Sequence, residues 1–501
     1  MIFNSVLRLI SIFIVAVFAS ACKNSPRESP AENALTKKID AYLMETVDRL
    51  KLPGLTIAVT RDGAVIYSKA FGYTNIDTKE PMKVEHIFHW ASVSKTFVAT
   101  AIMQLREKGK INLDEKLITY LPYFKQKDPN YKTITVRQML NHTSGIGDVD
   151  DYEWHNPQYD SGALERFVRS TANDNLRFQP GKDMAYSNTA YEALGDVIAK
   201  VSGMSFETYI RKNILDPLEM NTTSFLYPEI PDSLRVSGHR WAGEPVVSKH
   251  YPYNRMHGPS STLNSSALEM THYAFAHLNR GVYKGKRILA DSTYDLWWTN
   301  SINMEGKPKI GLAWWLDERH GVKTMSHSGG DTGFRSLFML APEKNISVML
   351  ACNYEVIRTF DLASAILDIL LDQEPYLARR PIGFDFAEVR KAKGLDVASE
   401  FVKETSEDSV KRGYYVWGED EGAYAYPGYL YLDNDMFEEA IAVFKFNVAQ
   451  FPNSGWAHSH LAGAYAKAGS KALARQHFQR AIELLPEEES FKEELKKVAG
   501  D

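Results

Sequence analysis

Residues 92–107 read SVSKTFVATAIMQLRE, with a serine and a lysine three positions apart at the start of a predicted helix. Because positions i and i+3 of a helix share one face, the Lys95 amine is expected beside the Ser92 hydroxyl. A serine hydroxyl needs a base within hydrogen-bond reach to act as a nucleophile, and burial favours the neutral lysine that can be that base. Helix starts also leave backbone amides free to stabilise an oxyanion. This stretch therefore favours acyl-transfer chemistry on Ser92.

The pattern alone is weak, because Ser20-Ala21-Cys22-Lys23 has the same spacing in a predicted signal peptide, where it cannot be catalytic. Two later motifs give it weight. Tyr186-Ser187-Asn188 follows Ser92 by 94 residues, and His327-Ser328-Gly329 follows after another 141 residues. Single matches to the second pattern also occur, as at Tyr73-Thr74-Asn75, so the order and setting of the three motifs carry the inference.

The segments around these motifs predict one antiparallel sheet flanked by terminal helices, together with a helical lobe. Runs rich in β-formers lie at both ends of the region, and mostly helical segments lie between them. The expected strands are 55–60, 64–70, 334–340 and 346–352, and the expected helices include 35–50, 95–107, 191–201 and 360–371. The first two strands form a predicted hairpin around Arg61-Asp62-Gly63.

With these motifs in place, residues 35–372 resemble the superfamily of serine β-lactamases and penicillin-binding proteins. The similarity is greatest to the class C β-lactamase-like branch, which contains esterases and D-amino-acid peptidases. It extends beyond the three motifs to residues 135–145, which read TVRQMLNHTSG, and to residues 178–181, which read FQPG. The resemblance implies a β-lactamase-like fold of the α/β (α+β) class for this domain.

The resemblance also implies roles for individual residues. Ser92 matches the nucleophile that forms an acyl-enzyme, and Lys95 matches its partner in proton transfer. Tyr186 matches a tyrosine that shares the role of base, for which a lowered phenol pKa is expected. Asn188 matches an amide that binds substrate and orders Lys95.

The third motif matches the strand that edges the substrate cleft, where His327, Ser328, Gly329 and Gly330 are expected to bind substrate. The resemblance places the oxyanion hole at the backbone amides of Ser92 and Gly330. Glycines at 329 and 330 are expected to let substrate approach the strand closely.

One position departs from the lactamase pattern. The third motif of lactamases begins with lysine, whose permanent charge attracts a substrate carboxylate, whereas this chain has His327. A histidine of ordinary pKa is mostly neutral at pH 7 and is expected only to donate a hydrogen bond. The substitution resembles esterase and D-aminopeptidase-like members more than lactamases.

Each assignment has an alternative. Ser92 and Lys95 can be surface residues of an ordinary amphipathic helix, Tyr186 can be a packed aromatic, and His327 can be structural. His86 and His89 are three positions apart, and Glu85 precedes them, but no third histidine at ligand spacing accompanies them. Neither a metal nor a cofactor is therefore expected.

The N-terminus predicts export. An apolar run, 9–18, too short to span a bilayer comfortably, is followed by Ala19-Ser20-Ala21-Cys22, which resembles a bacterial lipoprotein box. We therefore expect a lipoprotein signal peptide over residues 1–21, lipidation of Cys22 and a polar tether over residues 22–34. The expected location is the bacterial cell envelope, periplasmic or surface-facing, with the lipid in a membrane. An ordinary signal peptide or an N-terminal membrane anchor is the alternative.

The C-terminal region changes character. Tyr431, Ala440, Phe444 and Pro452 each recur 34 residues later. That period resembles the tetratricopeptide repeat, so residues 421–501 are expected to form two such repeats after a linker and helical segment at 373–420. Two repeats alone are marginal, so they are expected to pack on the helical stretch 386–411 or on the catalytic domain. Their tyrosine-rich first helix is either a groove for a protein partner or a packing surface, and chance periodicity is the alternative.

Composition narrows the functional classes. The 501 residues include 58 Lys+Arg and 63 Asp+Glu, a net charge of −5, which argues against a nucleic-acid partner. Cys22 and Cys352 are the two cysteines, so no disulfide framework is expected, and Cys352 is expected to be a buried small residue.

The expected function is an exported, lipid-anchored serine hydrolase that acts on small esters, amides or D-amino-acid peptides. The rivals are a protein that binds peptidoglycan or peptide without turnover and a true β-lactamase.

Overall fold

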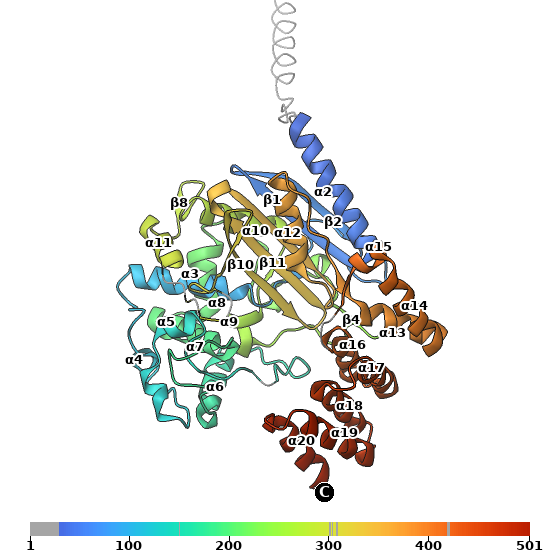
Figure 1. Ribbon diagram of the computed structural model, residues 1–501. Coiled ribbons are helices and arrows are strands. Elements are labelled where there is room, and N and C mark those ends of the chain that lie inside the picture. Colours follow the sequence, from blue (N-terminus) through green and yellow to red (C-terminus); the bar gives the residue numbers. More distant parts are fainter. Residues whose placement is uncertain are drawn as a thin grey trace, which may run out of the picture.

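The computed structural model describes residues 30–500 except 150, 300, 301, 303, 307, 308 and 418–420. Its centre is a six-stranded antiparallel sheet in the order β2-β1-β12-β11-β10-β9 (Figure 1). The strands are β1 (Gly54–Arg61), β2 (Ala64–Gly72), β9 (Trp315–Arg319), β10 (Val322–Asp331), β11 (Phe334–Ala341) and β12 (Ile346–Cys352). The predicted hairpin and the predicted antiparallel sheet are confirmed.

The two ends of the domain meet in the sheet, because β1 pairs with β12 from Leu55↔Cys352 to Arg61↔Ile346. Every residue of β12 is buried, since the strand is central and both faces are covered. Val348 and Cys352 face one hydrophobic core, whereas Met349 and Ala351 face the other. Burial raises the pKa of the Cys352 thiol to about 12, so this residue is a packed small side chain.

Helices cover both faces. α2 (Pro30–Arg49) and α12 (Thr359–Leu370) pack on one face, and α10 (Ala267–Leu278) packs on the other beside α3 (Ser94–Glu107). In the lobe, α7 (Asn188–Ser202) contacts both α3 and the short α9 (Gly258–Ser261). The remaining lobe helices include α4 (Leu117–Tyr120), α5 (Val136–Leu140), α6 (Ala163–Ser170), α8 (Phe206–Ile210) and α11 (Asp291–Thr299). This packing brings the first two sequence motifs together at the junction of lobe and sheet.

Short strand pairs complete the domain and its junctions. β3 (Phe88–His89) pairs with β6 (Asn264–Ser265), and β4 (His239–Trp241) pairs with β5 (Pro245–Val247). A parallel pair joins β13 (Arg380–Pro381) to β14 (Tyr415–Val416).

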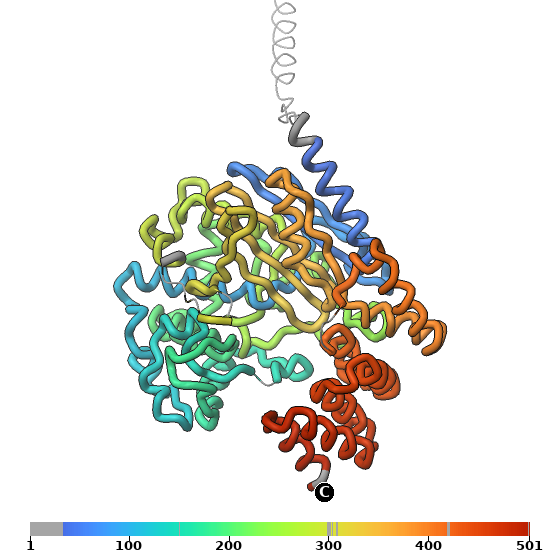
Figure 2. The backbone as a smooth tube through the Cα atoms, viewed as in Figure 1, coloured from blue at the N-terminus to red at the C-terminus, as the bar shows by residue number. Residues whose placement is uncertain are grey.

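The C-terminal region is a row of helices that leads away from the sheet (Figure 2). It contains α13 (Ile382–Lys393), α14 (Leu395–Glu407), α15 (Ser409–Gly413), α16 (Gly422–Asp433), α17 (Phe437–Gln450), α18 (Gly455–Lys467), α19 (Lys471–Leu484) and α20 (Glu489–Ala499). Phe386 of α13 stacks on Phe446 of α17 with 4.0 Å between ring centroids, and Trp241 lies 4.7 Å from Tyr431 of α16. Helix α17 therefore packs on the helical stretch 386–411, and helix α16 packs on the domain that contains the sheet, which are the two surfaces expected from the sequence.

The predicted signal peptide and Cys22 lie outside the described residues. Helix α2 begins at Pro30, so residues 30–34 are helical although they were expected to belong to the tether. Within the described residues, no helix combines the length and apolarity needed to cross a bilayer.

Candidate active site

Ser92 lies on a constrained turn immediately before α3. The Trp90 amide donates to the Leu263 carbonyl at 2.7 Å, which extends the β3–β6 pairing to the edge of this turn. Ala91 has a φ of 46°, a left-handed conformation that is uncommon for a residue other than glycine. The turn holds the Ser92 side chain half-buried at the start of the helix, as the spacing of the first motif predicts.

Lys95 is fully buried and makes three hydrogen bonds from Nζ. It donates to Ser92 Oγ at 3.0 Å, to Asn188 Oδ1 at 2.6 Å and to the Ser260 carbonyl at 2.8 Å. Two of these acceptors are carbonyl oxygens, which only accept. A neutral Lys95 therefore keeps its two protons on Asn188 and Ser260 and directs its lone pair at the Ser92 hydroxyl.

Burial lowers the pKa of Lys95 from its usual value near 10.5 to about 7, although the charges of Glu192, Asp331 and Asp148 oppose this shift. About half of the Lys95 side chains are therefore neutral at pH 7. Its geometry and its pKa both suit a base for Ser92.

Tyr186 lies over the same centre, with Lys95 Nζ 4.9 Å from its ring centroid. Burial raises the pKa of the Tyr186 phenol above its usual value, and a hydrogen bond with Ser92 opposes this shift only partly. The lowered phenol pKa expected from the sequence is therefore wrong, because the ring is enclosed and carboxylates surround it. Tyr186 remains protonated at neutral pH, which suits it to donate a hydrogen bond or a proton.

His142 packs against Tyr186 and was not among the predicted site residues. Its ring centroid lies 4.3 Å from that of Tyr186, and its Nδ1 accepts a hydrogen bond from the Ser187 amide at 3.2 Å. Burial lowers the pKa of His142 well below its usual value, so the ring is neutral. The signal was present in the segment 135–145, but only the folded chain places that segment under the second motif.

Asp148 fixes the orientation of Asn188. Its Oδ1 accepts from the Asn188 backbone amide at 2.8 Å and from Asn188 Nδ2 at 3.0 Å. The amide nitrogen of the side chain is thereby held toward Asp148, and its oxygen is held toward Lys95. The loop that carries Asp148 thus folds back onto the first turn of α7.

An Asp148→Ala variant is expected to lose about 10- to 100-fold in kcat, because Asn188 can then rotate and Lys95 loses a fixed acceptor. Asp148→Asn keeps an oxygen acceptor of the same size and is expected to recover most of the activity. Steady-state hydrolysis of one ester by both variants measures this. Equal losses in the two variants would show that the carboxylate acts through its charge and not by positioning Asn188.

Glu192 extends the same support by one helical turn, since it follows Asn188 by four positions on α7. It is fully buried, and its Oε1 accepts from Ser260 Oγ at 2.5 Å and lies 3.3 Å from His257 Nδ1. These contacts hold the Ser260 carbonyl that accepts from Lys95. The loop 255–261 therefore supplies an acceptor that orders the lysine.

The third motif lies on β10 at a free edge. β9 pairs only with Val322–Ser326, so the stretch 327–331 extends past its neighbour on that side. Ser328 and Gly330 are exposed there, whereas His327 and Gly329 are buried, because side chains alternate along a strand. An extended substrate can pair with such an edge.

Gly329 must be small because of a contact inside the protein. A Cβ on this residue would lie 2.0 Å from the Trp90 carbonyl oxygen, and Ser336 Oγ donates to the same oxygen at 2.8 Å. The turn that carries Ser92 therefore approaches the strand closely at Gly329. At Gly330, which is exposed, a Cβ would lie 3.1 Å from the flexible Arg335 side chain, and the close approach of substrate there stays a prediction.

His327 is neutral, as expected, but its N–H group is already bonded to a backbone carbonyl. Burial lowers the pKa of His327 to about 3. Its Nδ1 lies 2.7 Å from the Ser328 carbonyl, which only accepts, so Nδ1 carries the proton. Nε2 is then an acceptor, buried and without a partner among the described residues. The ring therefore offers the site a lone pair where a hydrogen-bond donor was expected.

A half-buried serine bonded to a fully buried lysine at a helix start, beside the edge of an antiparallel sheet, defines the class of penicillin-binding-protein-like serine hydrolases. The chain belongs to the β-lactamase family, because the family model described as Beta-lactamase matches residues 39–370. The helices of the C-terminal region follow the matched segment.

Two curated relatives show the same extent. Protein flp of Staphylococcus aureus (strain COL) is 28% identical over 324 residues, which cover 64% of each chain. The chain thus spans about 64% of the length of this relative. A penicillin-binding protein of Bacillus subtilis (strain 168) is 27% identical over 384 residues, which cover 71% of this chain and 79% of that protein.

Solved structures agree on the fold. An octameric penicillin-binding protein homologue from Pyrococcus abyssi superposes with a TM-score of 0.61 at 27% identity, over 68% of this chain and 78% of that one. The structure described as EstCE1, a hydrolase with promiscuous acyltransferase activity, superposes with a TM-score of 0.56 at 21% identity, over 65% and 95% of the two chains. The second likeness shows the fold alone.

Proposed function

We propose that the protein hydrolyses small carboxylic esters or amides, including peptides that contain D-amino acids, through an acyl-enzyme on Ser92. The observation that carries this proposal is the 3.0 Å contact between Lys95 Nζ and Ser92 Oγ, made by a lysine whose pKa burial lowers to about 7. A lysine with an ordinary pKa is protonated at neutral pH and cannot accept the serine proton.

The proposed reaction has two halves. Ser92 Oγ attacks the substrate carbonyl while its proton passes to Lys95, and the amides of Ser92 and Gly330 stabilise the oxyanion. The leaving group then departs with a proton delivered from Lys95 or through the Tyr186 phenol. Water enters in the second half, loses its proton to the same base and releases the acid from Ser92.

His327 directs the choice of substrate away from carboxylates. A neutral ring with an unpaired acceptor repels a carboxylate, whereas it accepts a hydrogen bond from an amide N–H or an ammonium group. Esters, amides and free D-aminoacyl groups therefore suit the site better than penicillins. The penicillin-binding relatives differ on this point, because their names record binding of penicillin.

The space beside β10 suits a substrate larger than a simple ester. A cavity of about 410 Å³ begins at Thr332, two residues beyond Gly330, and continues between Trp154, Lys249 and Asp433 of α16. Its walls carry charges of both signs, which a peptide can match. The end of α16 thus forms part of the wall of this cavity.

The substrate proposal is tested by comparing wild-type protein on p-nitrophenyl butyrate, D-alanine p-nitroanilide and nitrocefin. The ester or the D-alanyl anilide is expected to be hydrolysed at least tenfold faster, in kcat/KM, than nitrocefin. Acylation of Ser92 without turnover of any of the three would instead favour a binding protein. Preferred turnover of nitrocefin would favour a β-lactamase.

His327→Lys is expected to reverse part of this preference, because it restores a donor that can pair with the nitrocefin carboxylate. We expect kcat/KM for nitrocefin to rise about tenfold and that for the D-alanyl anilide, which carries an ammonium group, to fall. His327→Gln, which adds no charge, is the control. A fall in both values for His327→Lys alone would show that the ring is needed for packing.

For the rest of the chain we propose an envelope location, with Cys22 lipidated and residues 1–21 removed. The small-residue sequence before Cys22 supports this proposal.

We also propose that α16 to α19 are two tetratricopeptide repeats that can hold a protein partner. Gly428 supports the assignment, because a Cβ there would lie 2.5 Å from the Phe444 ring of the paired helix. Tyr429 and Trp456 are exposed and available to a partner.

A further inference from the structure

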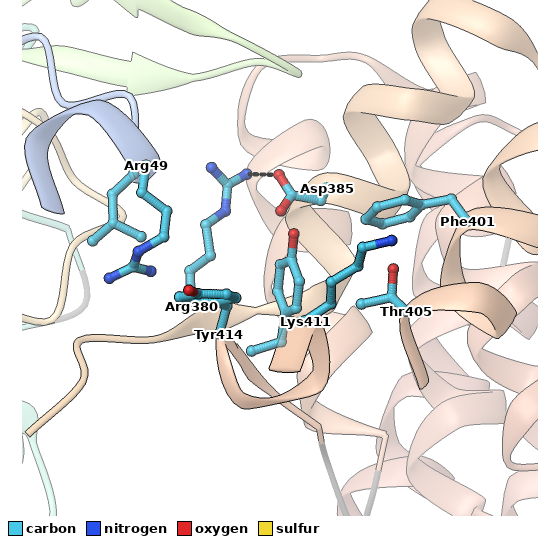
Figure 3. Close-up of a pocket in the computed structure, with 9 residues that line it drawn as sticks. Arg49, Arg380, Asp385, Phe401, Thr405, Lys411 and Tyr414 are labelled. Carbon is cyan, nitrogen blue, oxygen red and sulfur yellow. Dashed lines mark ion pairs between the residues drawn. The ribbon is translucent and has the colours of Figure 1, made fainter. Parts of the chain in front are cut away.

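A second cavity, which Ser92 and Lys95 do not line, lies between the N-terminal helix α2 and the helices that precede the repeats (Figure 3). Its volume is about 130 Å³, whereas a bound water needs only about 10–15 Å³ in this measure. Its walls are Arg49, Leu50, Arg380, Asp385, Phe401, Thr405, Lys411, Tyr414 and Tyr415. The parallel pairing of Arg380 with Tyr415 forms one side, so the cavity is built by the fold and not by one loop.

The cavity has an excess of positive charge. Arg49, Arg380 and Lys411 line it against a single carboxylate, Asp385. Arg380 is 6% exposed and is paired through Nη2 with Asp385 at 3.2 Å and with Glu388 at 2.6 Å. Asp408 lies 3.6 Å from Lys411, so Arg49 is the cation of the lining that has no carboxylate partner among the described residues.

Two guanidinium donors in this cavity lack acceptors. The Nε atoms of Arg49 and Arg380 are both buried without a hydrogen-bond partner among the described residues. Arg49 Nη2 donates to the Ala378 carbonyl at 2.7 Å, and Arg49 Cζ lies 5.2 Å from the centroid of the Tyr414 ring. These two contacts fix the position of the side chain. A buried donor without an acceptor is destabilising, and two in one positively charged cavity call for an anion.

The remaining lining residues are largely apolar or aromatic and favour a ligand that has an apolar part. Leu50 is buried, and Phe401, Tyr414 and Tyr415 present aromatic rings. Figure 3 shows Phe401, Lys411 and Thr405 along the wall opposite Arg49 and Arg380. An inorganic anion leaves these rings without contact, whereas an anion with an apolar body contacts both kinds of surface.

We propose that this cavity binds a small organic carboxylate whose charged end meets Arg49 and Arg380 and whose apolar body packs on the aromatic side chains. The ligand thereby bridges α2, which carries Arg49, to α14 and α15, which carry Phe401 and Lys411. The site is separate from the proposed hydrolase centre and does not depend on its chemistry.

The test is calorimetric titration of the full-length protein with benzoate and with benzamide, which has the same shape without the charge. Benzoate is expected to bind at one saturable site at least tenfold more tightly than benzamide. Arg49→Gln is expected to weaken benzoate binding at least tenfold, whereas Arg61→Gln, the same change at an exposed position outside the cavity, leaves it unchanged. Circular dichroism establishes that both variants are folded.

Lys411→Gln provides a second variant on an exposed side chain, and it is expected to weaken benzoate binding less than Arg49→Gln does. Benzoate binding that equals benzamide binding would overturn the proposal. So would benzoate binding that is unchanged in both cavity variants, or tighter binding of inorganic phosphate at the same site.

Discussion

A Ser92→Ala protein is expected to lose hydrolysis by about 10⁴-fold or more, because the bond to the acyl group can no longer form. The substitution removes one acceptor of Lys95 but leaves the Asn188 and Ser260 contacts that hold it. The site is therefore expected to remain folded around an intact lysine. Intact mass after incubation with a fluorophosphonate measures the effect directly, as one adduct on the wild-type chain and none on the variant.

Ser399→Ala is the matched control, because it makes the same change on an α14 side chain whose hydroxyl, within the described part of the chain, bonds to the Leu395 carbonyl alone. It is expected to label and to hydrolyse like the wild type. Hydrolysis that survives in Ser92→Ala would place the nucleophile elsewhere and contradict the proposed function.

The second large effect is expected for Lys95→Met, which keeps the length of the side chain and removes the base. Acylation is expected to slow by about 10²- to 10⁴-fold, the range that general base catalysis supplies. The stopped-flow rate of acylation by p-nitrophenyl butyrate measures it without the later steps.

Lys95→Arg separates base catalysis from charge. A guanidinium is always protonated, so it preserves the positive charge beside Ser92 but cannot accept a proton. We expect Lys95→Arg to be as slow as Lys95→Met. Substantial recovery in Lys95→Arg would show that the residue acts as an electrostatic group and that another base serves Ser92.

Local spacing was enough to find the reactive pair. Ser92 and Lys95 lie three positions apart where a helix starts, so their contact follows from the helix itself. The sheet was predictable for a similar reason, since its strands read as short runs rich in β-formers at both ends of the domain. Asn188 required the order of the motifs, because α7 meets α3 only in the folded chain.

The supporting residues could not be found in this way. Asp148 and Glu192 act through hydrogen bonds with Asn188 and Ser260, and their neighbouring sequence does not predict these partners. The pKa of Tyr186 depends on burial and on surrounding carboxylates, which spacing does not describe. The role of Gly329 likewise depends on the Trp90 carbonyl, 239 positions earlier in the chain.

The central claim is that Ser92 is activated by a neutral Lys95, and the pH dependence of its labelling tests this most directly. The neutral fraction of a base with a pKa near 7 is about one tenth of its maximum at pH 6 and approaches that maximum above pH 8. His327, with its pKa lowered to about 3, adds no transition between pH 5 and 9. We therefore predict that the rate of Ser92 phosphonylation rises once with pH, with a midpoint near 7. A rate that is constant from pH 5 to 9, or that rises only toward pH 10, would contradict the account.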